Sequence, residues 1–402
     1  MLTAYTKDGK KLCLGNHYKK ESLLYFRSRE KFHCPACGEP VILKLGDKKI
    51  YHFSHLKGGS CQDYFEGETE YHLQGKKQLY QWLRKQKIIA ELEFYIKEIR
   101  QRPDIIFLLN GQRYALEFQC SQISQEAVSK RTQSYLRNNY IPIWILGAMH
   151  FHRKNQHSVV LSKFQYLFLQ KKNSEWTIPY YCPENRIFIQ TNCLHPYSSK
   201  NTIANTSIRK EEKMTLNSLL APSHSFHVPL NVWKRAIQTV KQNFVHYHNA
   251  KSLSFIHEMY QNHLNLFLLP PVLGLPVKDA PYIESSPIVW QSYLYLDYIR
   301  HKRPGEILSL AAANQTIQHR IKRKDVALRF LPQAGHSDFR SAVFHYMETL
   351  TAIGLLTRKK MGFYQLNKSL EIPNSMCEQQ DMENTFYHNY WGIIEKELES
   401  RA

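Results

Sequence analysis

The chain has 402 residues, enough for two or three domains that each bury a core. Its 54 Lys and Arg against 34 Asp and Glu give a formal net charge of +20, which favours a polyanionic partner, with an anionic membrane surface as the rival. The sequence contains no apolar run of about 18 residues, no apolar signal core and too few cysteines for a disulfide scaffold. We therefore expect a cytoplasmic protein without a membrane span.

Residues 1–65 are expected to form a small N-terminal zinc-ribbon-like module. Cys34-Pro-Ala-Cys37-Gly predicts a zinc knuckle, because the turn directs two thiolates at one ion and the glycine supplies the unusual dihedrals. Tetrahedral zinc needs two more ligands, and the sequence leaves three candidates open: His52, His55 and Cys61. A free cysteine pair with incidental histidines is the plainer alternative. A redox Cys-x-x-Cys is disfavoured because its expected strand-to-helix context is missing.

Residues 66–155 are expected to form a compact α/β unit in the order helix, three strands, helix, strand. Apolar residues recur at helical spacing over 68–87 and alternate with polar ones over 90–96, so a helix and a half-buried strand follow each other. Asn110-Gly111 between two apolar runs predicts a type I′ hairpin, since both central residues need φ > 0. A second helix over 124–137 and a buried strand over 141–146 complete the unit.

Two acidic side chains are expected to face each other across this hairpin. Counting outward from a two-residue Asn110-Gly111 loop places Asp104 opposite Glu117, with Cβ atoms roughly 4.5–5.5 Å apart. Acids opposed on apolar strands repel each other unless a cation lies between them, so the pair predicts a site for Mg²⁺ or Mn²⁺. Such an ion polarises a phosphodiester and activates a water for in-line attack. Two solvated acids at a sheet edge are the plainer alternative.

Further polar side chains accompany this pair. Glu68, at the start of the preceding helix, is a candidate third carboxylate, and His72 and Lys76 follow on the same helix face. Gln119 lies two residues beyond Glu117 on the same face of the strand. An amide at that position can orient a water but cannot bring the positive charge of a lysine.

The remainder of the chain carries fewer signals. We expect a connecting region over 156–228, ending in a linker rich in Ser, Thr, Asn and Lys, and a mainly α-helical basic domain over 229–402. Residues 341–366 fit a winged helix, and they fit an ordinary helix plus hairpin equally well. Basic runs at 300–303, 319–324 and 358–360, added to the net charge, favour contact with nucleic-acid phosphates.

Six short motifs in the first 150 residues occur together in one order: Cys34-Pro-Ala-Cys-Gly, His52-Phe-Ser-His55, Gln101-Arg-Pro-Asp104, Ala115-Leu-Glu-Phe-Gln-Cys-Ser121, Lys130-Arg-Thr-x-x-Tyr135 and Ile143-Trp-Ile-Leu-Gly147. With the order of elements, they resemble the core of the PD-(D/E)XK, restriction-endonuclease-like nucleases. More narrowly, they resemble the competence protein CoiA family.

The resemblance implies a cytoplasmic protein that acts on incoming DNA and supports its recombination. It also implies that Asp104 and Glu117 bind the metal, that Gln119 stands in the usual lysine position, and that Glu68 is the helix acid, with Glu66 and Glu70 as competitors. The glutamine departs from the family pattern and leaves transition-state charge less well neutralised.

The leading hypothesis is therefore a Mg²⁺- or Mn²⁺-dependent deoxyribonuclease-type domain that processes transforming DNA, positioned by a structural zinc module and a basic helical domain. Single-stranded or branched DNA is the expected partner, together with recombination proteins. In the alternative hypothesis the protein has the same fold but no nuclease activity. It is then a DNA-binding recombination accessory factor with a degenerate nuclease site. RNA processing is a third hypothesis.

Overall fold

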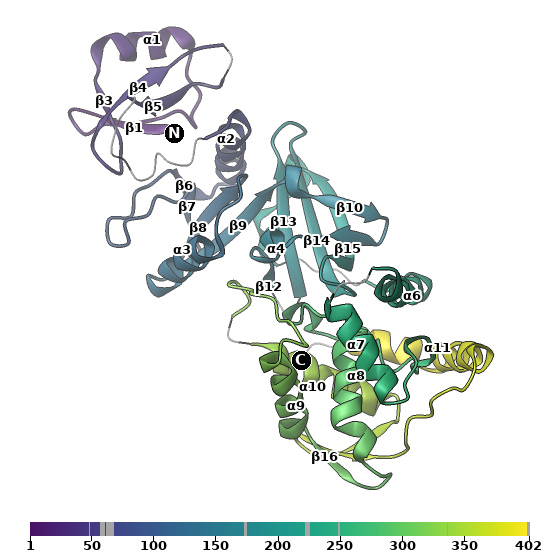
Figure 1. The fold of residues 1–402 in the computed structure, drawn as a ribbon. Coiled ribbons are helices and arrows are strands. Elements are labelled where there is room, and N and C mark those ends of the chain that lie inside the picture. The colour runs from purple at the N-terminus through teal and green to yellow at the C-terminus, as the bar shows by residue number, and fades with distance from the viewer. Residues whose placement is uncertain are drawn as a thin grey trace.

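The computed structural model describes residues 1–47, 49–56, 61, 68–172, 175–221, 226–247, 250–335 and 337–399. Figure 1 shows an elongated molecule in which an N-terminal module lies at one end, a sheet with flanking helices in the middle, and a mainly helical part at the other end. Among the helices of the described residues, none is long and apolar enough to cross a membrane.

The N-terminal module is a five-stranded sheet in the order β2-β1-β3-β4-β5, with one helix. The knuckle turn closes where the Cys34 amide donates to Glu39 O and the Gly38 amide donates to Cys34 O. Gly38 has φ 74°, which a glycine adopts without steric cost. The elements are β1 (Thr3–Thr6), β2 (Lys11–Cys13), α1 (Lys20–Arg29), β3 (Phe32–His33), β4 (Pro40–Lys44) and β5 (His52–His55).

The expected helix, three strands, helix, strand order is present in the middle of the chain. Strands β6 to β8 pair antiparallel in succession, and β8 and β9 pair parallel. The assignment of this core to the restriction-endonuclease-like fold stays a prediction. The elements are α2 (Glu70–Lys85), β6 (Ile89–Leu92), β7 (Ile105–Leu109), β8 (Gln112–Gln119), α3 (Gln125–Arg137) and β9 (Tyr140–Gly147).

The hairpin between β7 and β8 has the expected turn and register. Asn110 and Gly111 have φ values of 50° and 76°, and the pairing runs from Leu109 opposite Gln112 to Ile105 opposite Leu116. Because β7 begins at Ile105, Asp104 lies one residue before the strand. Continuing the register by one step places it opposite Glu117.

The first strand of this core is shorter than the expected 90–96. It ends at Leu92, because Glu93 has φ 49° and turns the chain away. The alternating pattern predicted an exposed Glu93, but its side chain is buried. The alternation of apolar and polar residues therefore predicted the wrong environment for Glu93.

Helix α2 packs against β8 at Gly75. A Cβ atom at Gly75 would stand 2.0 Å from the Phe118 ring, so only glycine allows the two elements to approach this far. The flanking residues His72 and Lys76 are thereby brought against Asp104.

The expected connecting region over 156–228 is wrong for most of its length. Strands β10 to β15 extend the core into a ten-stranded sheet in the order β10-β11-β15-β14-β13-β9-β8-β7-β6, with β12 paired to β13. Residues 201–210, expected in a linker, form β15 because their β-branched residues Thr202 and Ile203 are buried against β14 and β11. Residues 222–225 lie outside the described residues.

The elements of this region are η2 (Ala148–His150), β10 (His152–Asn155), β11 (Ser158–Val160), α4 (Lys163–Tyr166), β12 (Gln170–Lys172), β13 (Glu175–Cys182), β14 (Ile187–Pro196), β15 (Asn201–Lys210), η3 (Glu211–Lys213) and α5 (Leu216–Leu220), where η marks a 3-10 helix.

The C-terminal part is mainly helical, as expected, and its core also includes Tyr197 and Ile203 from the central part of the chain. A three-stranded sheet of order β16-β18-β17 adjoins it. The sequence α8, β16, α9, α10, β17, β18 is the order of elements in a winged helix, and that assignment stays a prediction. The elements are α6 (Leu230–His246), α7 (Ala250–Gln261), η4 (Leu266–Leu268), η5 (Ala280–Tyr282), α8 (Pro287–Asp297), η6 (Ile299–His301), β16 (Ile307–Ser309), α9 (Leu310–Lys322), α10 (Phe339–Ala352), β17 (Leu356–Lys360), β18 (Phe363–Leu366) and α11 (Met376–Glu399).

Candidate functional site: a Cys3His cluster and a buried carboxylate cluster

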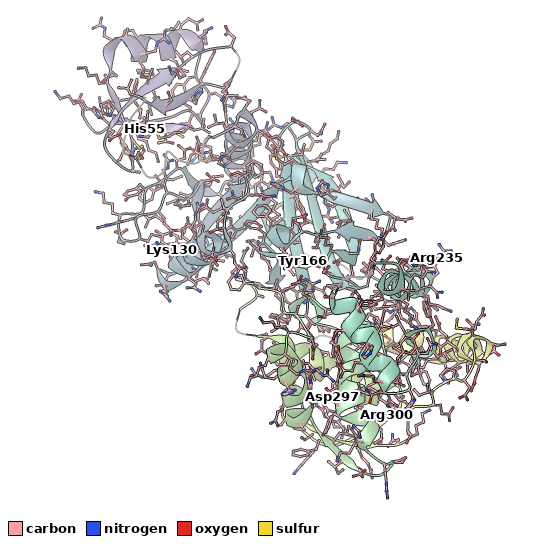
Figure 2. The ribbon with its side chains drawn as sticks, in the orientation of Figure 1. His55, Lys130, Tyr166, Arg235, Asp297 and Arg300 are labelled. Atoms are coloured by element: carbon pink, nitrogen blue, oxygen red, sulfur yellow. The ribbon has the colours of Figure 1, made fainter. Side chains whose placement is uncertain are left out.

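Four of the five expected zinc ligands converge in the N-terminal module. The ligand atoms of Cys34, Cys37, His55 and Cys61 all lie within 4.8 Å of one another, and Cys37 Sγ is 3.4 Å from His55 Nε2. Figure 2 shows His55 on the side of the module that faces the central sheet. The knuckle turn after β3 supplies the first two ligands, and the end of β5 supplies the histidine.

The structure also separates the candidates that the sequence left open. His52 lies outside the group, and its Nδ1 is 2.8 Å from the carbonyl oxygen of Ile50. Burial raises the pKa of the Cys34 thiol. A bound Zn²⁺ would reverse that preference, because the thiolate is the ligand form. Three sulfurs and one imidazole form a standard donor set for structural zinc, so these residues fit the ion.

Asp104 is buried and held at three points. Its Oδ2 accepts a 2.8 Å hydrogen bond from the Phe118 amide and lies 3.3 Å from His72 Nε2, while its Oδ1 lies 3.5 Å from Lys76 Nζ. Burial alone would raise the pKa of this carboxyl, but His72 and Lys76 outweigh burial and hold the pKa below its usual range. Asp104 is therefore ionised at neutral pH.

Glu117 is the second buried acid, with 2% of its surface exposed. Helix α3 supplies both partners of its Oε1 atom, Arg131 Nη2 at 2.5 Å and the Tyr135 hydroxyl, and neither bond uses Oε2. Burial raises the pKa of Glu117 to about 7; Arg131 opposes this effect and the charge of Asp104 adds to it. The two acids thus interact electrostatically, as the hairpin register predicted.

Lys76 is the central cation of the cluster, and its side chain is 1% exposed. Its ammonium contacts Glu68 and lies 2.5 Å from Glu93 and 3.5 Å from Asp104. Burial would lower the pKa of Lys76, but these carboxylates outweigh it and raise the pKa above its usual range. Lys76 therefore stays charged and compensates for acids that would be costly to bury alone.

The same cluster joins the N-terminal module to the core. Glu93 Oε2 accepts hydrogen bonds of 2.7 and 3.0 Å from the amides of Leu2 and Thr3. Glu68 also pairs with the Met1 amine. The carboxylates therefore help to dock the module as well as to surround Asp104.

Glu68 and its competitor Glu70 have different partners, and Gln119 bonds to the backbone. Glu68 reaches Lys76, whereas Glu70 accepts hydrogen bonds from the Ile50 amide and the Gln74 side chain. Glu66 lies outside the described residues. The Gln119 side-chain nitrogen donates to Ser121 O at 2.8 Å, so this amide supplies no cation at the position where a lysine was expected.

Several residues of this cluster were missed from the sequence. Arg131 and Tyr135 stand four positions apart on α3, which places them on one helix face, and that spacing could have identified them as partners of a buried acid. No sequence signal distinguishes Glu93 from its exposed neighbour Glu91.

The carboxylate cluster differs from a preformed metal cage. In the described part of the chain, Cys34, Cys37, His55 and Cys61 form the single group of three or more ligating side chains close enough to share an ion. Within the described residues, Glu117 Oε2 has no hydrogen bond, and Asp104 Oδ1 has only the 3.5 Å ion pair with Lys76. These oxygens suit a hard divalent cation, so the residues fit Mg²⁺ or Mn²⁺.

Comparison with known proteins places this core in a nuclease-like class, because residues 68–224 match the family model described as competence protein CoiA, nuclease-like domain. The N-terminal and C-terminal domain models of the same family match residues 15–64 and 228–379. The chain therefore belongs to the competence protein CoiA family.

A curated relative agrees with this assignment. Competence protein CoiA of Bacillus subtilis (strain 168) is 29% identical over 342 residues, which cover 85% of this chain and 91% of the relative. No solved structure matches the chain. The nuclease-like match includes the strands β10 to β15, which supports their place in one unit with the core.

Proposed function

We propose that the protein processes transforming DNA during competence, by divalent-metal-dependent hydrolysis of phosphodiester bonds at Asp104 and Glu117. The arrangement of these two acids supports the proposal most strongly. Both are buried in a nuclease-like domain, and they interact electrostatically. Among the described residues, Glu117 Oε2 has no hydrogen bond, and Asp104 Oδ1 has only the 3.5 Å contact with Lys76. Burying such a pair is costly, and a structural role does not require it.

The residues of the cluster would have separate tasks. Asp104 and Glu117 would hold Mg²⁺ or Mn²⁺, which when bound polarises the phosphodiester and lowers the pKa of a coordinated water. The Phe118 amide and Lys76 fix the orientation of Asp104, and Arg131 and Tyr135 fix that of Glu117. The side-chain amide of Gln119 would orient a water.

The name of the Bacillus subtilis relative supports the competence setting. The formal charge of +20 supports a nucleic-acid substrate, and single-stranded or branched DNA is the form we propose. The zinc-bound module would position the core, to which Glu93 and Glu68 connect it.

A cleavage assay with single-stranded, branched and duplex DNA tests the proposal. Wild-type protein should cut at least one of these substrates when Mg²⁺ or Mn²⁺ is present, and Asp104→Asn and Glu117→Gln should each abolish cutting. Glu126→Gln, on the exposed surface of α3, is the matched control and should cut normally. Cleavage that persists in both active-site variants would contradict the assignment.

A second function is favoured by the charge balance of the cluster. Lys76 and Arg131 already contact the two acids, and the amide of Gln119 cannot neutralise a phosphate. A DNA-binding recombination accessory factor with a degenerate nuclease site would show these features. Clean protein that binds DNA and never cuts it under any metal condition would support this alternative. Preferential binding or cutting of RNA would favour RNA processing.

A further inference from the structure

The hairpin β17–β18 projects from the C-terminal domain at the position of a wing. It pairs with β16, which Figure 1 shows at the end of the molecule farthest from the N-terminal module. The Leu310 amide donates to Gly362 O at 2.8 Å, so the start of α9 supports the hairpin turn. Gly362 has φ 74°, which permits that tight turn.

Helix α10, the helix that would read bases in a winged helix, is occupied by protein contacts. Of the α10 residues that the structure describes, Arg340 alone is exposed, and the others are buried or half-buried. Ser341 Oγ donates to Asp279 Oδ2, and His345 Nε2 lies 3.7 Å from the same carboxylate.

Asp279 continues this contact into the central sheet. Lys171 Nζ lies 2.7 Å from its Oδ1, and the Trp176 indole donates to the same oxygen at 3.1 Å. Both partners come from the β12–β13 hairpin. The face of α10 that carries Ser341 and His345 is therefore an interdomain contact and cannot enter a DNA groove without separating the two parts.

The hairpin carries positive charge and no acid. Residues 357–360 are consecutively exposed, and three of them are basic. Arg358 lies 3.4 Å from Glu348, whereas Lys359 and Lys360 form no ion pair with a carboxylate of the described residues. Met361 at the tip is 89% exposed.

The neighbouring basic run at 319–324 has a different role. Arg320 is buried, forms ion pairs with Glu258, Asp297 and Asp325, and stacks 4.0 Å above the Tyr293 ring. Its guanidinium holds α9 against α8 and α7. Part of this basic run therefore stabilises the domain, whereas no ion pair of the described residues holds the lysines of the hairpin.

We propose that the C-terminal domain binds duplex DNA through the β17–β18 hairpin, by phosphate contacts that do not read base sequence. The inference rests on the proposed DNA-processing function and names the surface that holds the duplex arms of a branched substrate. A projecting hairpin with adjacent lysines fits the two phosphate rows beside a groove. Single strands need exposed stacking platforms, and Lys360 already covers the hairpin's one aromatic candidate, Phe363, at 4.5 Å.

Binding of short duplexes by the full-length, zinc-loaded protein, without added divalent ions, tests the proposal. The double variant Lys359→Gln/Lys360→Gln should bind about tenfold more weakly, and the slope of log affinity against log salt should fall by about 2. Lys322→Gln/Lys324→Asn is the matched control. It removes the same charge at the far end of α9, roughly 20 Å from the hairpin turn, and asparagine tolerates the φ of 67° at position 324.

The proposal is supported if the hairpin variant alone loses affinity and shuffled duplex sequences bind equally. Equal losses in both variants would overturn it, because binding would then follow net charge. It would also be overturned by unchanged affinity in the hairpin variant, by tenfold preference for one duplex sequence, or by tighter binding of single strands. Cleavage depends on Asp104 and Glu117 and is measured separately, so failure of this surface leaves the proposed reaction testable.

Discussion

The partly buried Cys3His cluster and the buried carboxylate cluster balance their charges differently. In the first, four ligand atoms converge on one point, and burial favours the neutral thiol at Cys34. In the second, Lys76 and Arg131 already accompany the acids. From this difference we expect an ion to complete the first cluster as part of the fold, whereas the second cluster is already charge-balanced by protein side chains.

This contrast separates two roles for metal in one chain. Zinc in the N-terminal module would be a component of the stable structure. A divalent ion at Asp104 and Glu117 would be a reagent that enters beside existing ion pairs. Four experiments test whether the two clusters differ in this way.

Loss of a zinc ligand should have the largest effect. Cys34→Ser should reduce the zinc content from about one ion per chain to near zero, and structural zinc contributes on the order of 10 kcal/mol to folding. Metal analysis and thermal unfolding of the same preparation measure both quantities. His52→Asn, which removes a histidine outside the cluster, should keep its zinc. Equal loss in both variants would place His52 among the ligands.

Removal of the central cation should have the next largest effect. Lys76→Met leaves Glu68, Glu93 and Asp104 buried without their shared ammonium, a change that typically costs about 3–5 kcal/mol. Denaturant unfolding gives the free energy directly. Lys77→Met, at the next position of α2, removes a lysine without a carboxylate partner among the described residues and should cost less than about 1 kcal/mol. A similar loss of unfolding free energy in both variants would show that the ion pairs of Lys76 do not stabilise the protein.

The second cluster should also show a pH dependence that Glu117→Gln removes. Because the folded-state pKa of Glu117 is raised to about 7, the folded protein binds more protons here than the unfolded chain between about pH 4.5 and 7. Wild-type stability should therefore fall relative to the variant as the pH rises through this window, by roughly 3 kcal/mol in total. Unfolding at pH 5 and pH 8 without divalent ions measures it, and parallel curves would contradict it.

The smallest expected effect concerns the helix that positions the cluster. Gly75→Ala places a methyl group against the Phe118 ring and should destabilise the protein by about 1–3 kcal/mol while moving α2 away from Asp104. Chemical denaturation and DNA cleavage should both respond. Gly46→Ala meets no atom within 4 Å and should change stability by less than about 0.5 kcal/mol.

Local sequence signals predicted the parts of the fold that depend on neighbouring residues. The Asn110-Gly111 turn determined the hairpin register, and the knuckle turn determined the first two members of the Cys3His cluster, because both follow from short-range geometry. A Cys/His cluster that could hold zinc was likewise anticipated, but the choice of His55 over His52 depended on which histidine β5 directs at the knuckle.

Long-range packing explains what the sequence did not reveal. The buried environment of Glu93 depends on Lys76, which is 17 positions away. Strand β15 is stabilised by β14 and β11, so its polar composition alone indicated a linker. Arg131 and Tyr135 became recognisable as partners of Glu117 once α3 was packed against the sheet.

Direct titration of the zinc-loaded protein with Mn²⁺, followed by electron paramagnetic resonance of the free ion, is the most direct test of the proposed metal role of Asp104 and Glu117. Wild-type protein should bind Mn²⁺ at a site that disappears in both Asp104→Asn and Glu117→Gln, while the zinc content of all three proteins stays equal. Identical Mn²⁺ binding by wild type and variants, or no binding by wild type, would contradict a divalent ion at this pair of acids.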